Sequence, residues 1–232
     1  MVINGDCLDV LPQLPEATCI FADPPDNIGL NYHRYDDNIT NYGAWLDTCI
    51  NLFVGKAKVV WVSYNSKHVF AVGDIITRLL KEKKWLTAKS CVQTFTFGQH
   101  NKYDFGNNHR MLLRLKHVYT PLYLDSIRIP SWRQLHGDKR ANPNGRVPGD
   151  VFDFPRVTGN SKQRRSWHPT QLHEDLVRRC IKSCTKEGDT VIDPFAGTGT
   201  VERVCKKINR QCTSIEIDPF YCEQIENENK NL

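Results

Sequence analysis

The sequence lacks any long apolar segment. None of its hydrophobic runs approaches the roughly 20 residues that a membrane-spanning helix needs. The first ten residues, MVINGDCLDV, lack the basic and then apolar layout of a signal peptide. Repeats and low-complexity segments are also absent from the 232 residues. These absences predict one domain over residues 1–232, cytoplasmic and without a membrane partner.

Paired metal-binding motifs are missing as well. The chain has 9 cysteines, an odd number, and none of them stands in a CxxC pair. Cys180 and Cys184 are one helical turn apart, and the others are scattered. We interpret the cysteines as reduced, structural thiols rather than as zinc ligands, and we assign no metal.

Acidic residues are scarce in one segment. Between Arg128 and Trp167, nine Lys or Arg stand against three acids, a local excess of six that exceeds the +5 of the whole chain. Prolines and glycines make residues 117–167 irregular. A basic segment with aromatic residues favours contact with nucleic acid, although a solvated loop would show the same charge pattern.

On both sides of that segment, short apolar runs alternate with stretches of helical period. This alternation predicts an α/β domain around a mainly parallel sheet. We expect strands at 18–22, 58–63, 89–97, 110–116, 189–195 and 211–218. We expect helices at 41–55, 66–83, about 170–185, from 200 onward, and over the C-terminal residues.

The stretch VIDPFAGTGT, residues 191–200, runs from a strand into a glycine turn that opens a helix. Such a turn presents backbone N–H groups and the positive helix end to a ligand. It lacks the lysine of a phosphate-binding P-loop and the third glycine of the dinucleotide motif. Glu216, at the end of the next strand, is placed to hold two ribose hydroxyls. S-adenosylmethionine, with a ribose and no phosphate, has the matching shape. The alternative interpretation is that the glycine turn binds no ligand and merely joins the strand to the helix.

Two further stretches carry candidate site residues. FADPPDNIGLNY, residues 21–32, places Asp23 and two prolines after an apolar run. SWHPTQLHEDL, residues 166–176, places Pro169 at an expected helix start. Thr170 and Gln171 would either cap that helix or face a bound carboxylate, and local chemistry favours capping.

Taken together, these stretches resemble the β-class amino-methyltransferases of DNA. In that permuted arrangement a (D/N/S)PP(Y/F/W) motif precedes the FxGxG cofactor motif. The matching pieces are NGDCLDVLPQLP, ADPPDNIGLNY, GRVPGDVFDFPRVTGN, RRSWHPTQLHEDLVRRCI and GDTVIDPFAGTGT with IEID, in the expected order. The resemblance implies a seven-stranded, Rossmann-like methyltransferase sheet, circularly permuted, with residues 117–167 as an insertion for DNA recognition. DNA is then the partner, and a homodimer is left open.

The resemblance also implies roles for individual residues. The catalytic turn comprises Asp23, Pro24, Pro25 and Asp26. The residues expected around S-adenosylmethionine are Asp6, Cys7, His168, Thr170, Gln171, Asp193, Phe195, Gly197, Thr198, Gly199, Thr200 and Glu216. The residues expected to contact DNA are Tyr32, Tyr35, Arg133, Lys139, Arg140, Arg164 and Arg165. Adenine is favoured over cytosine because an initial aspartate is more usual for adenine in similar enzymes.

Asp26 departs from the pattern, because an aromatic residue normally follows the two prolines and stacks on the flipped base. Losing that stack would cost about 1–3 kcal/mol of substrate binding. Either a neighbouring aromatic, Tyr32 or Tyr35, replaces it, or Asp26 accepts a hydrogen bond from the base. The alternatives at the level of function are a weakened or inactive DNA-binding homologue and a methyltransferase of RNA or protein glutamine.

Overall fold

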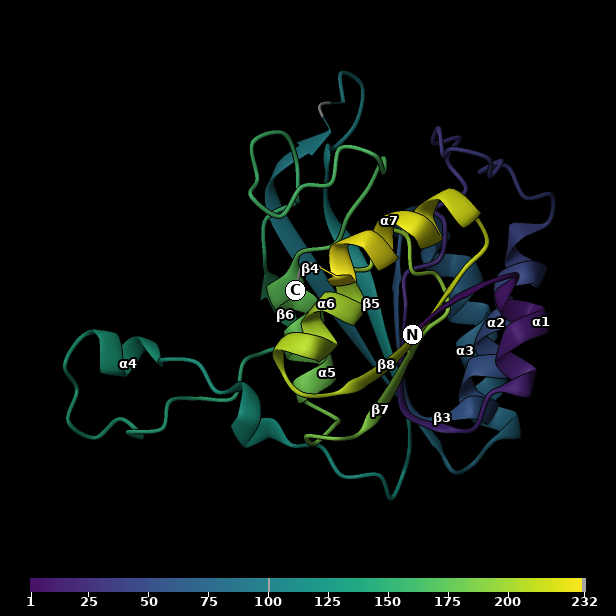
Figure 1. Ribbon diagram of the computed structural model, residues 1–232. Coiled ribbons are helices and arrows are strands. Elements are labelled where there is room, and N and C mark those ends of the chain that lie inside the picture. Colours follow the sequence, from purple (N-terminus) through teal and green to yellow (C-terminus); the bar gives the residue numbers. More distant parts are fainter. Residues whose placement is uncertain (100, 231–232) are drawn as a thin grey trace.

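The centre of the fold is formed by strands that are apolar on both faces. In the computed structural model, which describes residues 1–99 and 101–230, β2 (Ala17–Ala22) and β3 (Ala57–Tyr64) are buried along almost their whole length. Next to them, β7 (Thr190–Asp193) and β8 (Gln211–Glu216) are buried toward their carboxyl ends. Strands of this kind require helices on both faces of the sheet, and Figure 1 shows this three-layer arrangement.

The sheet has eight strands in the order β1-β8-β7-β2-β3-β5-β4-β6. β1 (Val2–Asn4) pairs with β8, and the strands from β1 to β3 are parallel. β5 (Asn107–His117) runs antiparallel between β3 and β4 (Leu86–Gln99). The expected number was seven, and the three-residue edge strand β6 (Val151–Asp153), which pairs with β4, comes from the segment predicted to be irregular. The short strands β1 and β6 were missed because three residues carry no periodicity.

Helices cover the two faces of the sheet separately. One face carries α1 (Cys7–Val10), α2 (Tyr42–Lys56) and α3 (Val69–Glu82), with the turns η1 (Leu11–Gln13) and η2 (Ser66–His68). The other face carries α5 (Glu174–Lys182) and α6 (Thr200–Lys207), and α7 (Pro219–Lys230) contacts β1 and β8. Within the described residues, no helix is long and apolar enough to cross a membrane.

The helix expected from about residue 170 begins later, at Glu174. His173 is its N-cap, and His173 Nδ1 accepts a hydrogen bond from Asp175 N–H at 3.2 Å. Capping by Thr170 or Gln171 is therefore wrong, since both residues lie in the preceding loop. The sequence misled because a proline is common at the first position of a helix, so Pro169 suggested an early start. A start at Glu174 with His173 as the N-cap fits the same sequence equally well.

The irregular segment divides into two parts at opposite ends of the sheet. Antiparallel β5 finishes at the end where β2 and β3 begin, and η3 (Leu124–Ile127) and an arm follow it there. The arm, residues 129–146, contains α4 (Trp132–Leu135), is closed by paired Ile129 and Arg146, and projects from the body (Figure 1). β6 then runs parallel to β4 and returns the chain to the carboxyl ends of the parallel strands. Residues 154–168 therefore lie at the other end of the sheet from the arm.

All nine cysteines are free thiols, and eight of them are buried. Burial raises the pKa of the Cys180 thiol well above the usual value. A hydrogen bond with the Cys184 thiol, together with burial, raises the pKa of the Cys19 thiol well above the usual value. These thiols pack in the core as small apolar side chains, as the sequence interpretation expected.

Candidate active site

A cavity of about 780 Å³ opens where the parallel strands end. Asp23 follows β2, Asn65 follows β3, Phe195 follows β7, and Glu216 ends β8; all four line the cavity. In open α/β sheets, ligands bind at this carboxyl edge because loops diverge there and leave a crevice. The topology thus brings the two halves of the predicted site, more than 160 residues apart in sequence, to one place.

The glycine loop is held in shape by Glu216. Gly197 has φ +50°, and its N–H donates to Glu216 Oε2 at 2.8 Å, while Asp218 N–H donates to Glu216 Oε1 at 2.9 Å. Asp193 accepts a hydrogen bond from Phe195 N–H at 3.1 Å. Burial raises the pKa of both carboxyl groups, that of Asp193 most strongly. Two buried carboxylates therefore flank the loop, and each accepts hydrogen bonds from its backbone.

The wall of the cavity fits a ligand that carries positive charge and hydrogen-bond donors. Asp6, Asp23, Asp193 and Glu216 all line it, and Asp193 is only 2% exposed. A buried carboxylate is stabilised by a cationic partner or by a hydrogen-bond donor. These acidic side chains therefore favour a cationic ligand over a phosphate. S-adenosylmethionine brings a sulfonium, an ammonium group and two ribose hydroxyls, and the residues present fit it.

His168 lines the cavity and packs directly against the glycine loop. Its Nδ1–H donates to the Thr170 carbonyl at 2.6 Å, so Nε2 is the unprotonated nitrogen when the ring is neutral. A Cβ on Gly197 would lie 3.1 Å from this Nε2. Burial lowers the pKa of His168 to about 4, and the ring is therefore neutral at physiological pH. His168 thus presents an uncharged face to the loop.

Gln171 ties together the loop before α5. Its Oε1 accepts from Arg165 N–H at 3.0 Å, and its Nε2 donates to the Gln163 carbonyl at 2.6 Å. Thr170 and Gln171 both line the cavity, close to His168. This geometry brings the loop to the cavity and away from the helix end that it was expected to cap.

Most of the predicted cofactor residues meet in this one cavity. Those that line it are Asp6, Cys7, His168, Thr170, Gln171, Asp193, Phe195, Gly197, Thr198, Thr200 and Glu216. Gly199 does not line it. With φ +70°, Gly199 starts α6, and a Cβ there would lie 3.0 Å from Ile225, so this glycine permits close packing of α6 on α7.

The turn after β2 is fixed by side chains from α2, from η2 and from the loop that precedes α2. Tyr42 Oη donates to the Pro25 carbonyl at 2.7 Å, and His68 Nε2–H donates to the Asp26 carbonyl at 2.7 Å. The Asp37 carboxylate accepts from Asn27 N–H at 2.8 Å, which holds the chain just past the turn. The Pro24 carbonyl accepts no hydrogen bond from the part of the chain that the structure describes. Of the three carbonyls at residues 24–26, Pro24 thus keeps its oxygen free for a ligand.

Arg110, on β5, was missed by the sequence analysis. Its Nη2 donates to Asp23 Oδ1 at 2.6 Å and its Nη1 to Asp26 Oδ2 at 2.8 Å. Its Nε donates to Ser63 Oγ at 2.6 Å. Burial raises the pKa of Asp23, and the Arg110 charge opposes that rise. The first arginine of the expected strand at 110–116 was the available signal, but only the antiparallel pairing of β5 with β3 brings it to Asp23.

The aromatic residues proposed as substitutes for a stacking residue lie at the cavity. Tyr32 packs edge-on against His168, with ring centroids 5.4 Å apart, and against Tyr35, at 5.8 Å. Burial raises the pKa of both hydroxyls, that of Tyr35 to about 12. Phe95, with Arg156 over its ring at 5.4 Å, also lines the cavity and was not predicted.

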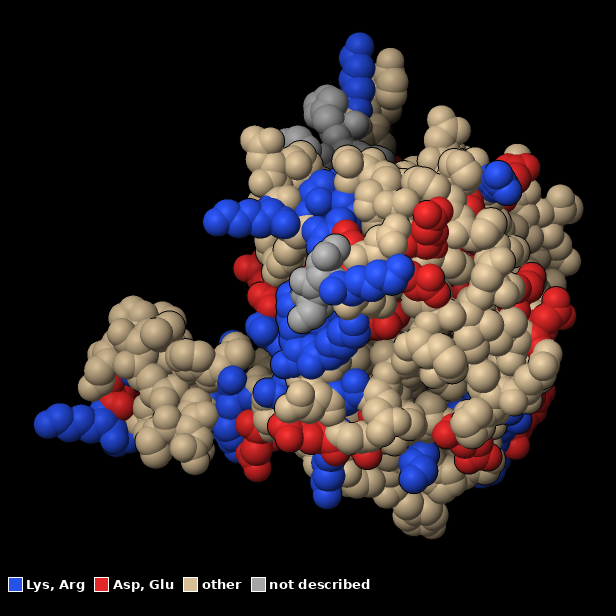
Figure 2. Space-filling view, viewed as in Figure 1, with Lys and Arg blue, Asp and Glu red and all other residues tan. Residues whose placement is uncertain are grey.

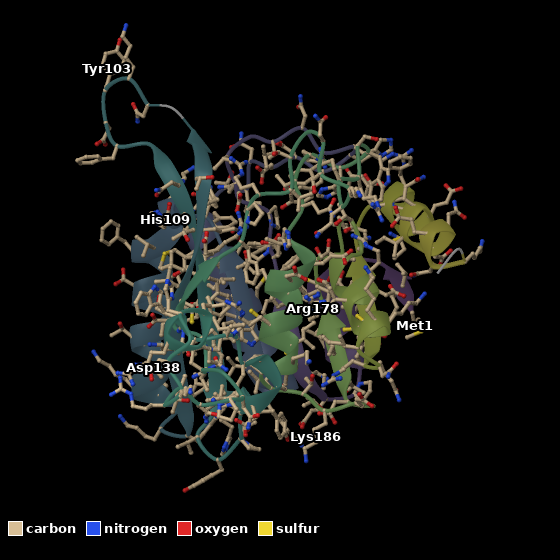
Figure 3. All side chains as sticks on the ribbon, turned by 90° about the vertical axis from the view of Figure 1, so that its left-hand side faces the viewer. Met1, Tyr103, His109, Asp138, Arg178 and Lys186 are labelled. Atoms are coloured by element: carbon tan, nitrogen blue, oxygen red, sulfur yellow. The ribbon has the colours of Figure 1, made fainter. Side chains whose placement is uncertain are left out.

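The predicted DNA-contacting cations are not gathered at one surface. Arg164 lines the cavity, but Arg165 is paired with Glu228 on α7. Arg133, Lys139 and Arg140 belong to the arm, where Arg140 bonds Asp138 at 3.0 Å. Figure 3 shows Asp138 well below Tyr103, which marks the tip of the hairpin of β4 and β5. Figure 2 shows Lys and Arg gathered over α5 and α6, between the arm and the upper loops.

The fold and this cavity define an S-adenosylmethionine-dependent methyltransferase. The family described as DNA methylase, of the N6 and N4 type, matches residues 17–227, and the chain belongs to that family. It is thus a DNA methyltransferase, with S-adenosylmethionine as its cofactor. The α/β methyltransferase fold expected from the sequence is confirmed.

Named relatives and solved structures agree with this assignment. The type II methyltransferase M.HpaI of Haemophilus parainfluenzae is 30% identical over 237 residues, covering 96% of this chain and 71% of that protein. The DNA adenine methyltransferase YhdJ of Escherichia coli (strain K12) is 29% identical, covering 95% and 79%. The PvuII DNA methyltransferase (cytosine-N4-specific) matches in fold with a TM-score of 0.72 at 15% identity, covering 97% and 84%. An M1.HpyAVI complex with S-adenosylmethionine matches with a TM-score of 0.63 at 15% identity, covering 98% of both chains.

Proposed function

We propose that this methyltransferase modifies the exocyclic amine of a base flipped out of DNA, with adenine N6 as the favoured acceptor. The observation that carries the proposal is the free Pro24 carbonyl beside Asp23, in the same cavity as the glycine loop. The aspartate that opens the motif supports adenine, as does the similarity to a relative named as a DNA adenine methyltransferase.

The chemistry needs two hydrogen-bond acceptors near the amine. The lone pair of an exocyclic amine is delocalised into the ring, so the nitrogen is a poor nucleophile. Hydrogen bonds from its two N–H groups to the Asp23 carboxylate and the Pro24 carbonyl would favour a tetrahedral nitrogen with a directed lone pair. Bound S-adenosylmethionine supplies the methyl group as an electrophile. The prolines, Tyr42 and His68 keep the turn rigid, which preorganises the acceptors and orients the amine.

The cofactor is assigned to the half of the cavity around the glycine loop. Glu216 would accept hydrogen bonds from the ribose hydroxyls, and Asp6 and Cys7 lie on the side proposed for adenine. Thr170, Gln171 and His168 form the wall proposed for the amino acid end. Asp193, Phe195 and the residues from Gly197 to Thr200 complete the set, with Gly199 acting through packing on α7.

DNA would approach the end of the sheet that holds the cavity. Base flipping delivers the amine to Asp23, and Tyr32 or Tyr35 would contact the flipped base. Within residues 117–167, the part after β6 supplies Arg156 and Arg164 to the cavity, so we assign target recognition to that part. The arm carrying Arg133, Lys139 and Arg140 would reach only flanking DNA. The circularly permuted order of the motifs, with Asp23 before Gly197, belongs to the same proposal.

The test is a transfer assay with labelled S-adenosylmethionine and DNA, followed by mass spectrometry of the nucleosides. N6-methyladenine is the expected product, and Asp23→Ala should abolish it. N4-methylcytosine would correct the choice of base. Label on RNA or protein alone would overturn the choice of substrate, and cofactor and DNA binding without any transfer would identify an inactive homologue. Mapping the modified positions would then give the recognition sequence.

A further inference from the structure

The Arg110 guanidinium bridges two carboxylates at the edge of the cavity. It bonds Asp23 and Asp26 through different terminal nitrogens, at 2.6 and 2.8 Å, and Ser63 through Nε. Its side chain is 18% exposed. Three hydrogen bonds on a planar, rigid fork fix its orientation, which a lysine ammonium cannot reproduce.

Asp26 lines the cavity, but the bridge to Arg110 engages its carboxylate. Its Oδ2 is bonded to Arg110, and its Oδ1 is buried with no partner among the described residues. The whole residue is only 7% exposed. Neither carboxylate oxygen is thus open to a base that enters the cavity, which argues against a direct hydrogen bond from Asp26 to the substrate.

Asp23, in contrast, keeps part of its carboxylate open. Its side chain is 27% exposed, and only Oδ1 bonds Arg110. The ionised carboxylate accepts a hydrogen bond from an amine more strongly than the protonated acid does, since a charged acceptor strengthens the bond. Burial works against ionisation and raises the pKa of Asp23, while the Arg110 charge favours the carboxylate. The two carboxylates in turn outweigh the effect of burial on Arg110 and raise the pKa of the guanidinium.

We propose that Arg110 is a positioning residue for methyl transfer, which holds Asp23 ionised with one oxygen directed to the acceptor amine, and that Asp26 acts by anchoring Arg110. The inference rests on the proposed role of Asp23 in binding the amine. The aspartate after the two prolines is then half of a charge pair with β5, and an aromatic residue from elsewhere in the cavity contacts the base.

The first test is the pH profile of single-turnover transfer for Arg110→Lys and Arg110→Met. Loss of the bridge misplaces Asp23, and we expect the rate at neutral pH to fall about tenfold for Lys and about a hundredfold for Met. For Met the acid limb should also move to higher pH, because Asp23 then loses the positive charge that favours its ionised form, whereas Lys keeps such a charge. A merely structural role would lower the amount of active protein and leave the acid limb in place. Calorimetric binding of S-adenosylmethionine, expected to be unchanged, checks that the cofactor half is intact.

The second test is a double-mutant cycle of Asp26→Asn with Arg110→Lys, which also serves if Arg110→Met does not fold. Since Asp26 acts through Arg110, the loss from Asp26→Asn should be clearly smaller in the Lys background than in the native one. Asp26→Tyr should lower transfer, because Arg110 loses its anchor. Additive losses, or a faster Asp26→Tyr enzyme, would show that the residue acts on the base and overturn the inference.

A third variant separates this inference from the proposed function. Asp23→Ala, which removes the acceptor oxygens, should abolish transfer in every background. If Asp23→Ala remains active, the assignment of the amine to Asp23 fails. If it is inactive while Arg110→Lys and Arg110→Met keep the native rate and acid limb, only the role of Arg110 fails.

Discussion

His168 lies against Gly197, and a Cβ on this glycine would sit 3.1 Å from His168 Nε2. Gly197 also has φ +50°, a conformation that side chains with a Cβ adopt at a cost. The contact joins the loop before α5 to the loop after β7. Both residues line the cofactor half of the cavity. We therefore expect substitution of either one to change the affinity for S-adenosylmethionine.

Gly197→Ala should weaken S-adenosylmethionine binding. Steric pressure on His168 and the positive φ together cost about 1–3 kcal/mol, or about tenfold to a hundredfold in affinity. Isothermal calorimetry measures the change. Gly73→Ala is the matched control, because Gly73 lies inside α3 with a negative φ and no heavy atom within 4 Å of the added Cβ. Equal binding by both variants would contradict the assigned position of the cofactor.

His168 should make stability depend on pH in a defined window. Its folded-state pKa, about 4, lies below the ordinary value of 6.5, so the unfolded chain binds the proton more readily between these values. The contribution of the neutral ring is therefore complete above pH 6.5 and is lost as pH falls toward 4, by up to about 3 kcal/mol. Urea unfolding at several pH values measures it. His168→Gln should flatten the dependence in this window, and an unchanged slope would argue against a buried neutral His168.

Tyr32→Ala should weaken capture of the flipped base. Loss of one aromatic contact with a base costs about 1–3 kcal/mol, while Tyr32→Phe, which keeps the ring, should bind almost normally. Fluorescence of a base analogue at the target position reports the flipped state. Tyr119→Ala is the control, since Tyr119 is 86% exposed and follows β5 at the opposite end of the sheet. If Tyr32→Ala leaves the fluorescence of the flipped base analogue unchanged, Tyr32 is not the substitute stacking residue.

Arg156→Gln should reduce DNA affinity about tenfold and lower the slope of log affinity against log salt by about one. Arg156 lines the cavity beside Phe95, whereas Arg140, on the arm, bonds Asp138. Arg140→Gln should therefore change affinity for a short duplex far less. Fluorescence anisotropy across a salt series gives both values. A larger effect at Arg140 would move the recognition surface to the arm.

The sequence by itself determined the α/β class, the central strands and the two motifs of the site. Short apolar runs rich in β-branched residues, such as residues 18–22 and 58–63, are typical of buried central strands, and the chemistry of a DPP turn and a glycine loop is local. These features follow from composition and short-range spacing, so they could be predicted without coordinates.

Only the tertiary structure decided how distant residues combine. The pairing of β5 with β3 brings Arg110 to Asp23 and Asp26, and no local pattern encodes that register. The loop holding Thr170 faces the cavity because His173 caps α5. The basic segment divides because β5 and β6 run in opposite directions and finish at opposite ends of the sheet. Arg140 and Arg156 are thus separated by the length of the strands. Each outcome depends on long-range strand pairing, which fixes direction and register only when the whole sheet has formed.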